Sequence, residues 1–276
     1  MNARIEFAQL RARIARIPAL RPESHAASGS LSIGLPCVDA YLHQAAAPLG
    51  AVHEIAGDAC DEEHGAAGAG FLALLLKACT PSGWIVWVTQ DADLYAPGLA
   101  GYGLDLRRLI LVSARRDADV CWALEEALRS RSLGAVVGEV GVLTLNATRR
   151  LQLAAEQAAI PCLLLRRWRT RELASRQRAQ PIAAVTRWRI TPQSGSRMPD
   201  QNGITLSELG PVQWRLDLWR CRNAAAASWI MEFDHADEQR VTAFPVPVAA
   251  ALADRSIPAA PAADAERATA TLLRFG

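Results

Sequence analysis

The chain has 276 residues, of which 51% are hydrophobic, and its formal net charge at pH 7 is +2. This length and composition indicate a globular protein with one large or two modest domains. The nearly neutral charge excludes coating of a nucleic-acid duplex by overall electrostatics, so any contact with nucleic acid must come from a local patch.

The cysteines and the N-terminal segment bear on the compartment. The six cysteines contain no CxxC pair, which is typical of isolated thiols in a reducing compartment. The segment MNARIEFAQLRARIARIPAL has arginines among its apolar positions, unlike a signal peptide, and no apolar run is long enough to span a membrane. We therefore expect a cytoplasmic protein that contacts no membrane.

Residues 1–30 are expected to form an amphipathic helix and a linker. Four apolar residues, spaced by three, four and three positions, predict one helix face that ends at Pro18: Phe7, Leu10, Ile14 and Ile17. The other face carries Arg4, Arg11 and Arg16. A linker rich in Ala, Ser and Pro follows, so the helix can pack either on its own domain or on a partner. We assign its four apolar residues to partner binding.

Residues 31–244 are expected to form the core, which begins with alternating strand and helix patterns. Five short apolar segments are typical of parallel strands buried on both faces: Val52–Ile55, Trp84–Thr89, Leu109–Ser113, Gly134–Gly138 and Pro161–Leu165. Helices are predicted between them at 69–79, 92–101, 117–131 and 147–159, the last with Asn146 as its N-cap. This order predicts an α/β fold with a central, mostly parallel sheet flanked by helices.

Three stretches after Arg166 have the two-residue period of antiparallel strands: AAVTRWRI, VQWRLDLWRCR and SWIMEFD. Their tryptophans are expected mostly in the core or on a sheet face: Trp188, Trp214, Trp219 and Trp229. Residues 245–276 are rich in Ala and Pro and are predicted to form a flexible tail.

The segment between Ile55 and the helix predicted at 69–79 raises the main functional question. A strand, a glycine-containing loop and an apolar helix are the parts of a phosphate-binding loop. Four glycines fit this interpretation: Gly57, Gly65, Gly68 and Gly70. The loop nevertheless has no Lys, Arg, Ser or Thr, and Lys77 lies roughly 10 Å beyond the predicted helix start.

The loop contains acidic residues and no lysine or arginine. Asp58, Asp61, Glu62 and Glu63 would repel a triphosphate at short range. We interpret the loop as a degenerate nucleotide loop that binds no cofactor, and the alternative is an ordinary turn from strand to helix. A metal site is not predicted, because His53, Cys60 and His64 match no standard spacing of zinc ligands.

Six arginines follow the fifth predicted strand, at the edge of the sheet: Arg166, Arg167, Arg169, Arg171, Arg176 and Arg178. Arginines with Trp168 among them suit phosphate pairing together with base or guanidinium stacking. Most charge runs are solvated faces, however. Weak binding to single-stranded or primer-template DNA is therefore one hypothesis for this segment.

Several longer motifs resemble the RecA core. The phrase LSIGLPCVDAYLHQAAAPLGAVHEIAG resembles the lead-in to the RecA ATP loop, and WIVWVTQDADLYAPGLAGYGLDLRRLILV resembles the next unit. GAVVGEVGVL falls where RecA has its magnesium-associated acidic strand, with Glu139 at the place of the aspartate. The resemblance covers residues 30–233 and implies a RecA-like core closed by antiparallel strands. It places the catalytic glutamate on or near Gln90, whose amide cannot act as a carboxylate base.

With the emptied loop, the N-terminal amphipathic segment and the ending TRWRI…WRLDLWRCR…WIMEF, the chain resembles the ImuA family. The resemblance implies a non-catalytic accessory protein of the SOS response to DNA damage, which acts in mutagenic translesion synthesis. The implied partners are an ImuB-like inactive Y-family polymerase homologue and an error-prone replicative-type polymerase, and contact with RecA is permitted. The alternatives are a RecA-type ATP-binding switch or ATPase with an unorthodox loop, and a SulA-like cell-division inhibitor.

Overall fold

The computed structural model describes residues 29–130, 132–193, 198–199, 205–206, 212–233 and 241–246. Residues 1–28 and 247–276 lie outside this part of the chain. The amphipathic helix predicted around Phe7 to Ile17, and all but the first two residues of the tail predicted at 245–276, are therefore not addressed by the structure. In the described residues, no helix has the length and apolar character needed to cross a membrane.

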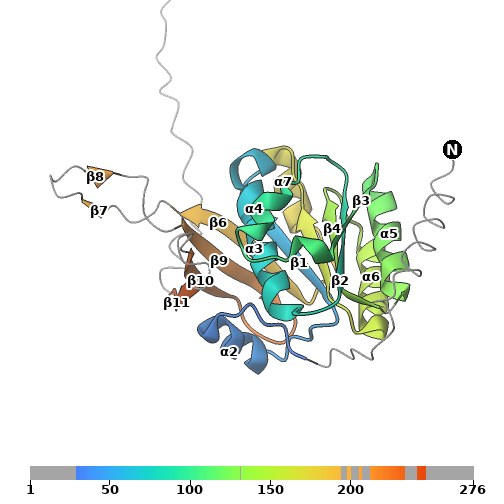
Figure 1. Cartoon of the computed structure of the whole chain (residues 1–276), viewed down its shortest axis with the longest axis horizontal. Coiled ribbons are helices and arrows are strands. Elements are labelled where there is room, and N and C mark those ends of the chain that lie inside the picture. The colour runs from blue at the N-terminus through green and yellow to red at the C-terminus, as the bar shows by residue number, and fades with distance from the viewer. Residues whose placement is uncertain are drawn as a thin grey trace, which may run out of the picture.

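A nine-stranded sheet forms the centre of the molecule (Figure 1). Its strands are β1 (Val52–Gly57), β2 (Trp84–Thr89), β3 (Leu109–Ser113), β4 (Leu133–Val140), β5 (Cys162–Arg166), β6 (Thr186–Gln193), β9 (Val212–Cys221), β10 (Ala227–Phe233) and β11 (Val241–Pro245). They lie in the order β11-β10-β9-β6-β1-β5-β4-β2-β3. A separate small hairpin pairs β7 (Met198–Pro199) with β8 (Thr205–Leu206).

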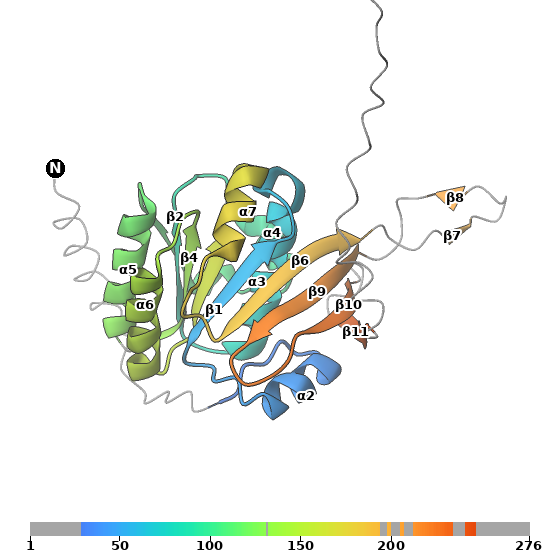
Figure 2. The same ribbon diagram turned by 180° about the vertical axis from the view of Figure 1, so that it is seen from behind.

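The sheet is parallel from β6 to β3 and antiparallel from β6 to β11 (Figure 2). The predicted mostly parallel α/β core with added antiparallel strands is therefore confirmed. Two details differ. AAVTRWRI was expected to be an antiparallel strand, but β6 runs parallel to β1 on one side and antiparallel to β9 on the other. The last strand, β11, was not predicted, and it extends to Pro245, which the sequence analysis had placed in the tail.

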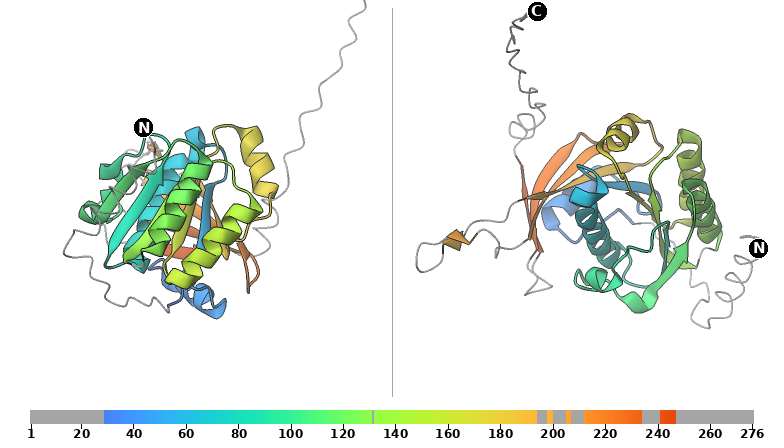
Figure 3. Two further views of the ribbon diagram at one scale, coloured as in Figure 1. Left: turned by 90° about the vertical axis from the view of Figure 1, so that its right-hand side faces the viewer. Right: turned by 90° about the horizontal axis from the view of Figure 1, so that it is seen from above.

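Helices cover both faces of this sheet (Figure 3). The described helices are α2 (Pro36–Gln44), α3 (Asp61–Cys79), α4 (Ala96–Ala100), η1 (Leu106–Arg108), α5 (Asp117–Arg129), α6 (Leu145–Ala158) and α7 (Arg171–Ala179). Helices α2 and α3 share a large buried cluster with β1, β5, β6, β9 and β10, while α5 and α6 pack in a second cluster on β1, β2, β4 and β5. Trp188, Trp214 and Trp229 are buried in the first cluster, as predicted.

Three helix boundaries differ from the predictions. Helix α3 begins at Asp61, eight residues before the predicted start, because acidic residues in a first turn interact favourably with the helix dipole and alanines support the glycines that follow. Lys77 is consequently 16 residues into the helix, or about 24 Å from its start. Helix α4 covers only 96–100, and α6 is capped by Thr144, whose side chain accepts from Ala147 N, and not by Asn146.

Candidate functional site

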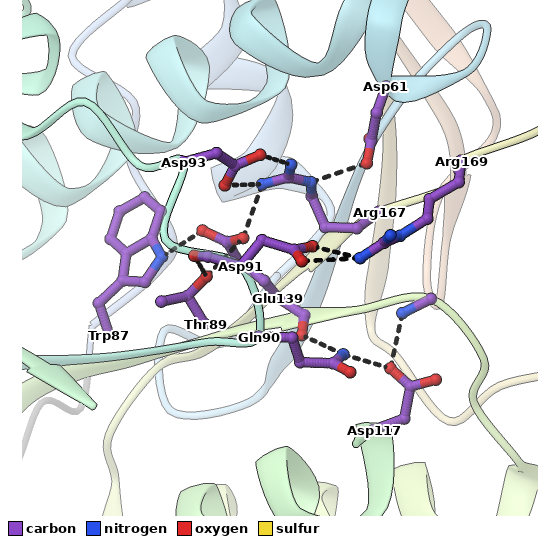
Figure 4. Close-up of polar contacts among 11 residues, drawn as sticks. Asp61, Trp87, Thr89, Gln90, Asp91, Asp93, Asp117, Glu139, Arg167 and Arg169 are labelled. Atoms are coloured by element: carbon purple, nitrogen blue, oxygen red, sulfur yellow. Dashed lines mark hydrogen bonds and ion pairs between the residues drawn. The ribbon is translucent and has the colours of Figure 1, made fainter. Parts of the chain in front are cut away.

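The carboxyl ends of β1, β2, β4 and β5 meet at one edge of the sheet, because parallel strands end on the same side. The loop after β1 leads into α3 at this edge, and the loop after β5 carries the arginine run. The loop after β1 and the arginines, which were expected to form separate sites, therefore lie together. Figure 4 shows the Arg167 side chain pointing toward Asp61 at the start of α3.

Arg167 lies at the centre of this arrangement (Figure 4). Its Nε donates to Asp61 Oδ2 at 2.8 Å, Nη1 donates to Glu139 Oε2 at 2.7 Å, and Nη2 donates to Asp93 Oδ2 at 2.5 Å. The three carboxylates come from the start of α3, the end of β4 and the loop after β2. We call these four residues the Arg167 cluster. The loop after β1 contains no cationic residue, and the guanidinium group of Arg167 places a positive charge beside it.

Glu139 anchors the Arg167 cluster in the interior. Its side chain is almost fully buried and also accepts from Trp87 Nε1 at 2.7 Å and from Thr89 Oγ1 at 3.0 Å. Burial raises the pKa of the Glu139 carboxyl, and Arg167 and the two donors oppose that shift. Burial lowers the pKa of Arg167, but its bonds to Asp93 and Asp61 outweigh this and raise the pKa above its ordinary value, so the guanidinium stays charged.

Backbone N–H groups of the loop already have acceptors within the protein. Asp58 N donates to Ile190 O at 3.1 Å, Ala59 N donates to His64 Nδ1 at 3.0 Å, and Asp61 N donates to Trp168 O at 2.9 Å. A phosphate bound in the usual way would need N–H groups of this kind to be free. It would have to displace these acceptors and approach the carboxylates of the Arg167 cluster.

Packing accounts for two of the four glycines. A Cβ on Gly57 would lie 2.7 Å from the Cβ of His64, and a Cβ on Gly70 would lie 2.6 Å from the ring of Trp214. Close packing of the loop on α3, and of α3 on β9, requires the absence of a side chain at both positions. Gly68 meets Leu165 at 3.1 Å, whereas Gly65 has room for a Cβ.

Gln90 is held by a neighbouring acid. Its Nε2 donates to Asp117 Oδ1 at 2.8 Å and to the backbone oxygen of Glu139 at 3.3 Å. Asp117 also accepts from Gly141 N and Val142 N, both at 2.8 Å. These bonds fix the loops after β2 and β4 to the start of α5. The amide at the position implied for a catalytic base is thereby engaged in a structural network.

The arginine run divides into buried and exposed members. Arg166 is 3% exposed and donates from Nη2 to Gly141 O at 2.9 Å and to Gln177 Oε1 at 3.0 Å. Arg178 donates to the backbone oxygen of Asp58. The guanidinium groups of Arg166 and Arg178 each lie 5.4 Å from the ring centroid of Trp168, which is 2% exposed. Trp168 therefore packs inside the protein against two guanidinium groups, which is the second of the two stacking modes expected for it, and its ring is not exposed for stacking with a base.

The other three arginines of the run are exposed. Arg169 Nη2 lies 2.7 Å from Asp91, and Arg171 pairs with Glu63 at the first turn of α3. Exposed ion pairs of this kind contribute little free energy, so they can be exchanged for a phosphate. The segment follows β5, which is an interior strand, so these arginines lie at the carboxyl end of the sheet rather than beside an edge strand.

His53, Cys60 and His64, which were considered as possible zinc ligands, have separate surroundings in the structure. His53 is fully buried, with Nδ1 2.8 Å from Thr186 Oγ1 and Nε2 3.3 Å from Leu49 O. Burial lowers its pKa to about 4, although backbone hydrogen bonds oppose the shift, so the ring is neutral. His64 caps the loop through Ala59, and Cys60 precedes the first turn of α3.

The meeting of Arg167 with Asp61, Asp93 and Glu139 was not predicted from the sequence. Arg167, Glu139 and Asp61 were each named, but as parts of three different features. Asp93 was missed altogether, although its place just after an apolar strand, in the phrase TQDAD, is a signal for a side chain at the carboxyl edge of a parallel sheet.

Comparisons with known proteins agree with the resemblance noted in the sequence. No protein-family model matches the chain. It is 37% identical over 236 residues to Protein ImuA of Caulobacter vibrioides strain NA1000 / CB15N, covering 84% of this chain and 93% of that protein, and the same values hold for Protein ImuA of strain ATCC 19089 / CIP 103742 / CB 15. SulA from Pseudomonas aeruginosa matches with a TM-score of 0.37 and 23% identity, over 43% of this chain and 98% of that chain. The extent and identity of the match to the two Caulobacter proteins show that the chain belongs to the ImuA family.

Proposed function

We propose that this chain is a non-catalytic accessory protein of damage-inducible, error-prone translesion DNA synthesis, and that it acts by binding other proteins. Membership of the ImuA family supports the process. The Arg167 cluster supports the mode of action: an internal guanidinium and three carboxylates lie beside the loop where a RecA-type ATPase would hold its triphosphate. A protein that does not use ATP works through its surfaces.

A titration with ATP and magnesium tests the absence of nucleotide binding. Thermal unfolding of the full chain is measured with and without millimolar MgATP, next to a RecA-type ATPase with an intact loop as positive control. Binding stabilises a folded state by about 2.7 kcal/mol at a ligand concentration 100 times Kd. We expect no shift in Tm for this chain and a clear shift for the control. Stabilisation with ATP turnover would favour the ATP-dependent switch.

The proposed partners are an ImuB-like inactive polymerase homologue and an error-prone replicative-type polymerase, with RecA as a further candidate. Pull-down of these proteins by the full chain is compared with pull-down by chains lacking residues 1–20 or 245–276. We expect one truncation to lose a partner. Capture unchanged by both would refute docking through either terminal segment. Cell filamentation on expression would instead favour a SulA-like division inhibitor.

The amphipathic pattern near the N-terminus allows a finer test. Phe7→Glu with Ile14→Glu removes the apolar face, and Arg4→Glu with Arg11→Glu changes the charge and keeps the apolar face. If Phe7, Leu10, Ile14 and Ile17 bind the partner in a helix-in-groove mode, the first pair should abolish capture and the second should only weaken it. The reverse order would place the contact on the arginines.

Binding to DNA is a separate part of the proposal. The residues proposed to contact DNA are the exposed arginines of the run: Arg169, Arg171 and Arg176. Arg169→Glu with Arg171→Glu should weaken binding to a single-stranded oligonucleotide at low salt and reduce its salt dependence. Arg107→Glu with Arg116→Glu, on another part of the exposed surface, is the matched control. Equal binding by the two variants would remove this segment from the DNA hypothesis.

A further inference from the structure

A mainly apolar cleft of about 380 Å³ opens beside the Arg167 cluster, between α3 and α4. Its larger apolar lining residues are Leu94, Tyr95, Leu99 and Tyr102. Tyr95 is 73% exposed, although a tyrosine side chain gains free energy from being covered. Tyr102 is held in place by ring contacts to Trp214, with centroids 5.4 Å apart, and to Phe233, with centroids 5.0 Å apart.

One end of the cleft is acidic. Asp61, Asp93 and Arg167 line this end, and Glu139 lies behind Arg167. Three carboxylates there face one guanidinium, so the Arg167 cluster is negative as a whole. Asp93 is about half exposed and its second contact to Arg167, at 3.4 Å, is long, so it can accept from a further donor. The cleft therefore suits a large apolar side chain next to a cationic one, and it disfavours a polyphosphate.

The chain itself contains such a sequence. Residues 272–275 read Leu-Leu-Arg-Phe, and Phe275 is the only aromatic residue after Phe244. The described chain leaves the core at Val246, whose N donates to Ser228 O at 2.8 Å beside β10. The other end of β10 is Phe233, which contacts Tyr102, a lining residue of the cleft. The residues beyond 246 therefore begin beside β10, the strand whose last residue, Phe233, contacts the cleft residue Tyr102.

The length of the connecting segment suits this path. Val246 and Leu272 are 26 residues apart, and a fully flexible chain of that length would have a root-mean-square span of roughly 28 Å. Strand β10, with 7 residues, is about 24 Å long. A connection of matching length gives a high effective concentration of the segment at the cleft, so a contact that is weak between separate molecules is populated within one chain.

We propose that residues 272–275 dock in the cleft between α3 and α4 of the same chain, with Phe275 on Tyr95, Leu99 and Tyr102 and with Arg274 at Asp61 and Asp93. Docking would cover the exposed tyrosine and add a cation to the Arg167 cluster. A partner that uses the cleft must then displace the segment, or bind the segment once it is released. The inference rests on the proposed function in one respect, that nucleotide does not fill this region.

Photocrosslinking in the full chain tests the docking. The photoreactive aromatic p-benzoylphenylalanine replaces Phe275, and the crosslinked peptides are identified by mass spectrometry. We expect crosslinks within one chain to residues 61–70 or 93–102. The same photoreactive residue in place of Ala262 is the control and should react there much less. Arg274→Gln should lower the yield about fivefold, the effect of one partly exposed ion pair, while Arg274→Lys should retain most of it.

Each other outcome overturns the proposal. Crosslinks from position 275 to other parts of the core place the segment elsewhere, and crosslinks between two chains identify a second copy as the occupant. Crosslinks to the cleft from the photoreactive residue at position 7, and not from 275, identify the N-terminal segment as the occupant. The experiment contains no nucleotide or partner protein, so its failure leaves the proposed function standing. ATP binding in the separate titration would refute the proposed function and would also remove the premise that nucleotide does not fill this region, so the two failures are distinguishable.

Discussion

Arg167 and Glu139 form an ion pair of 2.7 Å between the residue that follows β5 and the seventh residue of β4. Glu139 is 1% exposed, and a buried carboxylate is costly unless it is paired and accepts hydrogen bonds. Arg167 provides the charge, and Trp87 and Thr89 provide further donors. The pair makes the end of β4 a structural anchor that depends on an arginine placed 28 residues later.

Removing Arg167 should therefore destabilise the fold. We expect Arg167→Ala to lower the free energy of unfolding by about 2 kcal/mol, less than for a fully buried pair because Asp93 is partly solvated. Glu139→Gln in the same chain should restore about half of the loss, since a neutral amide needs no counter-charge. Its oxygen can still accept from Trp87 Nε1, and its NH2 group can donate to Thr89 Oγ1, whose own proton goes to Asp91 O. Urea unfolding of the single and double variants measures both effects. A double variant no more stable than Arg167→Ala would contradict the pairing.

The glycines of the α3 segment should respond in opposite directions to alanine. Gly70→Ala puts a methyl group 2.6 Å from Trp214 and 2.8 Å from Tyr102, so we expect a loss of about 1–2 kcal/mol from overpacking. Gly65→Ala meets its first neighbour, the Asp61 side chain, at 3.5 Å and should gain about 0.5–1 kcal/mol from better helix propensity. Chemical unfolding of the two variants is the measurement. Equal changes in the free energy of unfolding for the two variants would mean that close packing is not the reason for a glycine at position 70.

The sequence was sufficient to predict the parallel core because its strands are continuous apolar runs. Trp84–Thr89 and Leu109–Ser113 were predicted to the residue, since turn-forming segments bound them clearly. The start of α3 could not be placed in the same way. DEEHGAAGAG combines acidic residues that favour a helix start with glycines that disfavour a helix, and packing of Gly70 against Trp214 decides between them.

The site was predicted only as separate pieces. Spacing along the chain indicates which residues follow a strand, but it cannot show that Arg167 after β5 points at Asp93 after β2, because that depends on the strand order β5-β4-β2. The arginine run was interpreted as one surface because its residues are adjacent. In the structure, Arg166 is buried under α7 while Arg169 is exposed, a difference that arises from the end of β5 and the turn that follows it.

The N-terminus of α6 offers a paired test of its cap. Thr144 Oγ1 accepts from Ala147 N at 3.2 Å, and Asn146 is the second residue of the helix. We expect Thr144→Ala to cost about 1 kcal/mol of stability, the usual effect of losing an N-cap. Asn146→Ala should be neutral or slightly stabilising because alanine has the higher helix propensity. Urea midpoints of the two variants decide the matter, and a larger loss for Asn146→Ala would restore the boundary expected from the sequence.

Stability should fall in mild acid because of His53. The Nε2 atom of His53 lies beside Leu49 O, a carbonyl oxygen that can only accept, so Nε2 carries the proton of the neutral ring. The Nδ1 atom of His53 therefore accepts from the hydroxyl of Thr186, whose oxygen in turn accepts from Trp188 Nε1. Burial lowers the folded pKa to about 4, whereas the unfolded pKa is about 6.5. Between these values the unfolded chain binds more protons, so stability is full above pH 6.5 and is lost as the pH falls toward 4.

The expected loss across this window is about 3 kcal/mol, from 1.36 kcal/mol per pKa unit. Carboxylates also titrate in this range, so the informative quantity is the difference between two chains. His53→Gln should be less stable than the original chain at pH 7 because it disturbs a buried hydrogen-bond chain, but its stability should depend less on pH between 6.5 and 4. Urea unfolding at a series of pH values measures both curves. Parallel curves would show that His53 is not the group that titrates, and a steeper curve for His53→Gln would reverse the sign of the assigned shift.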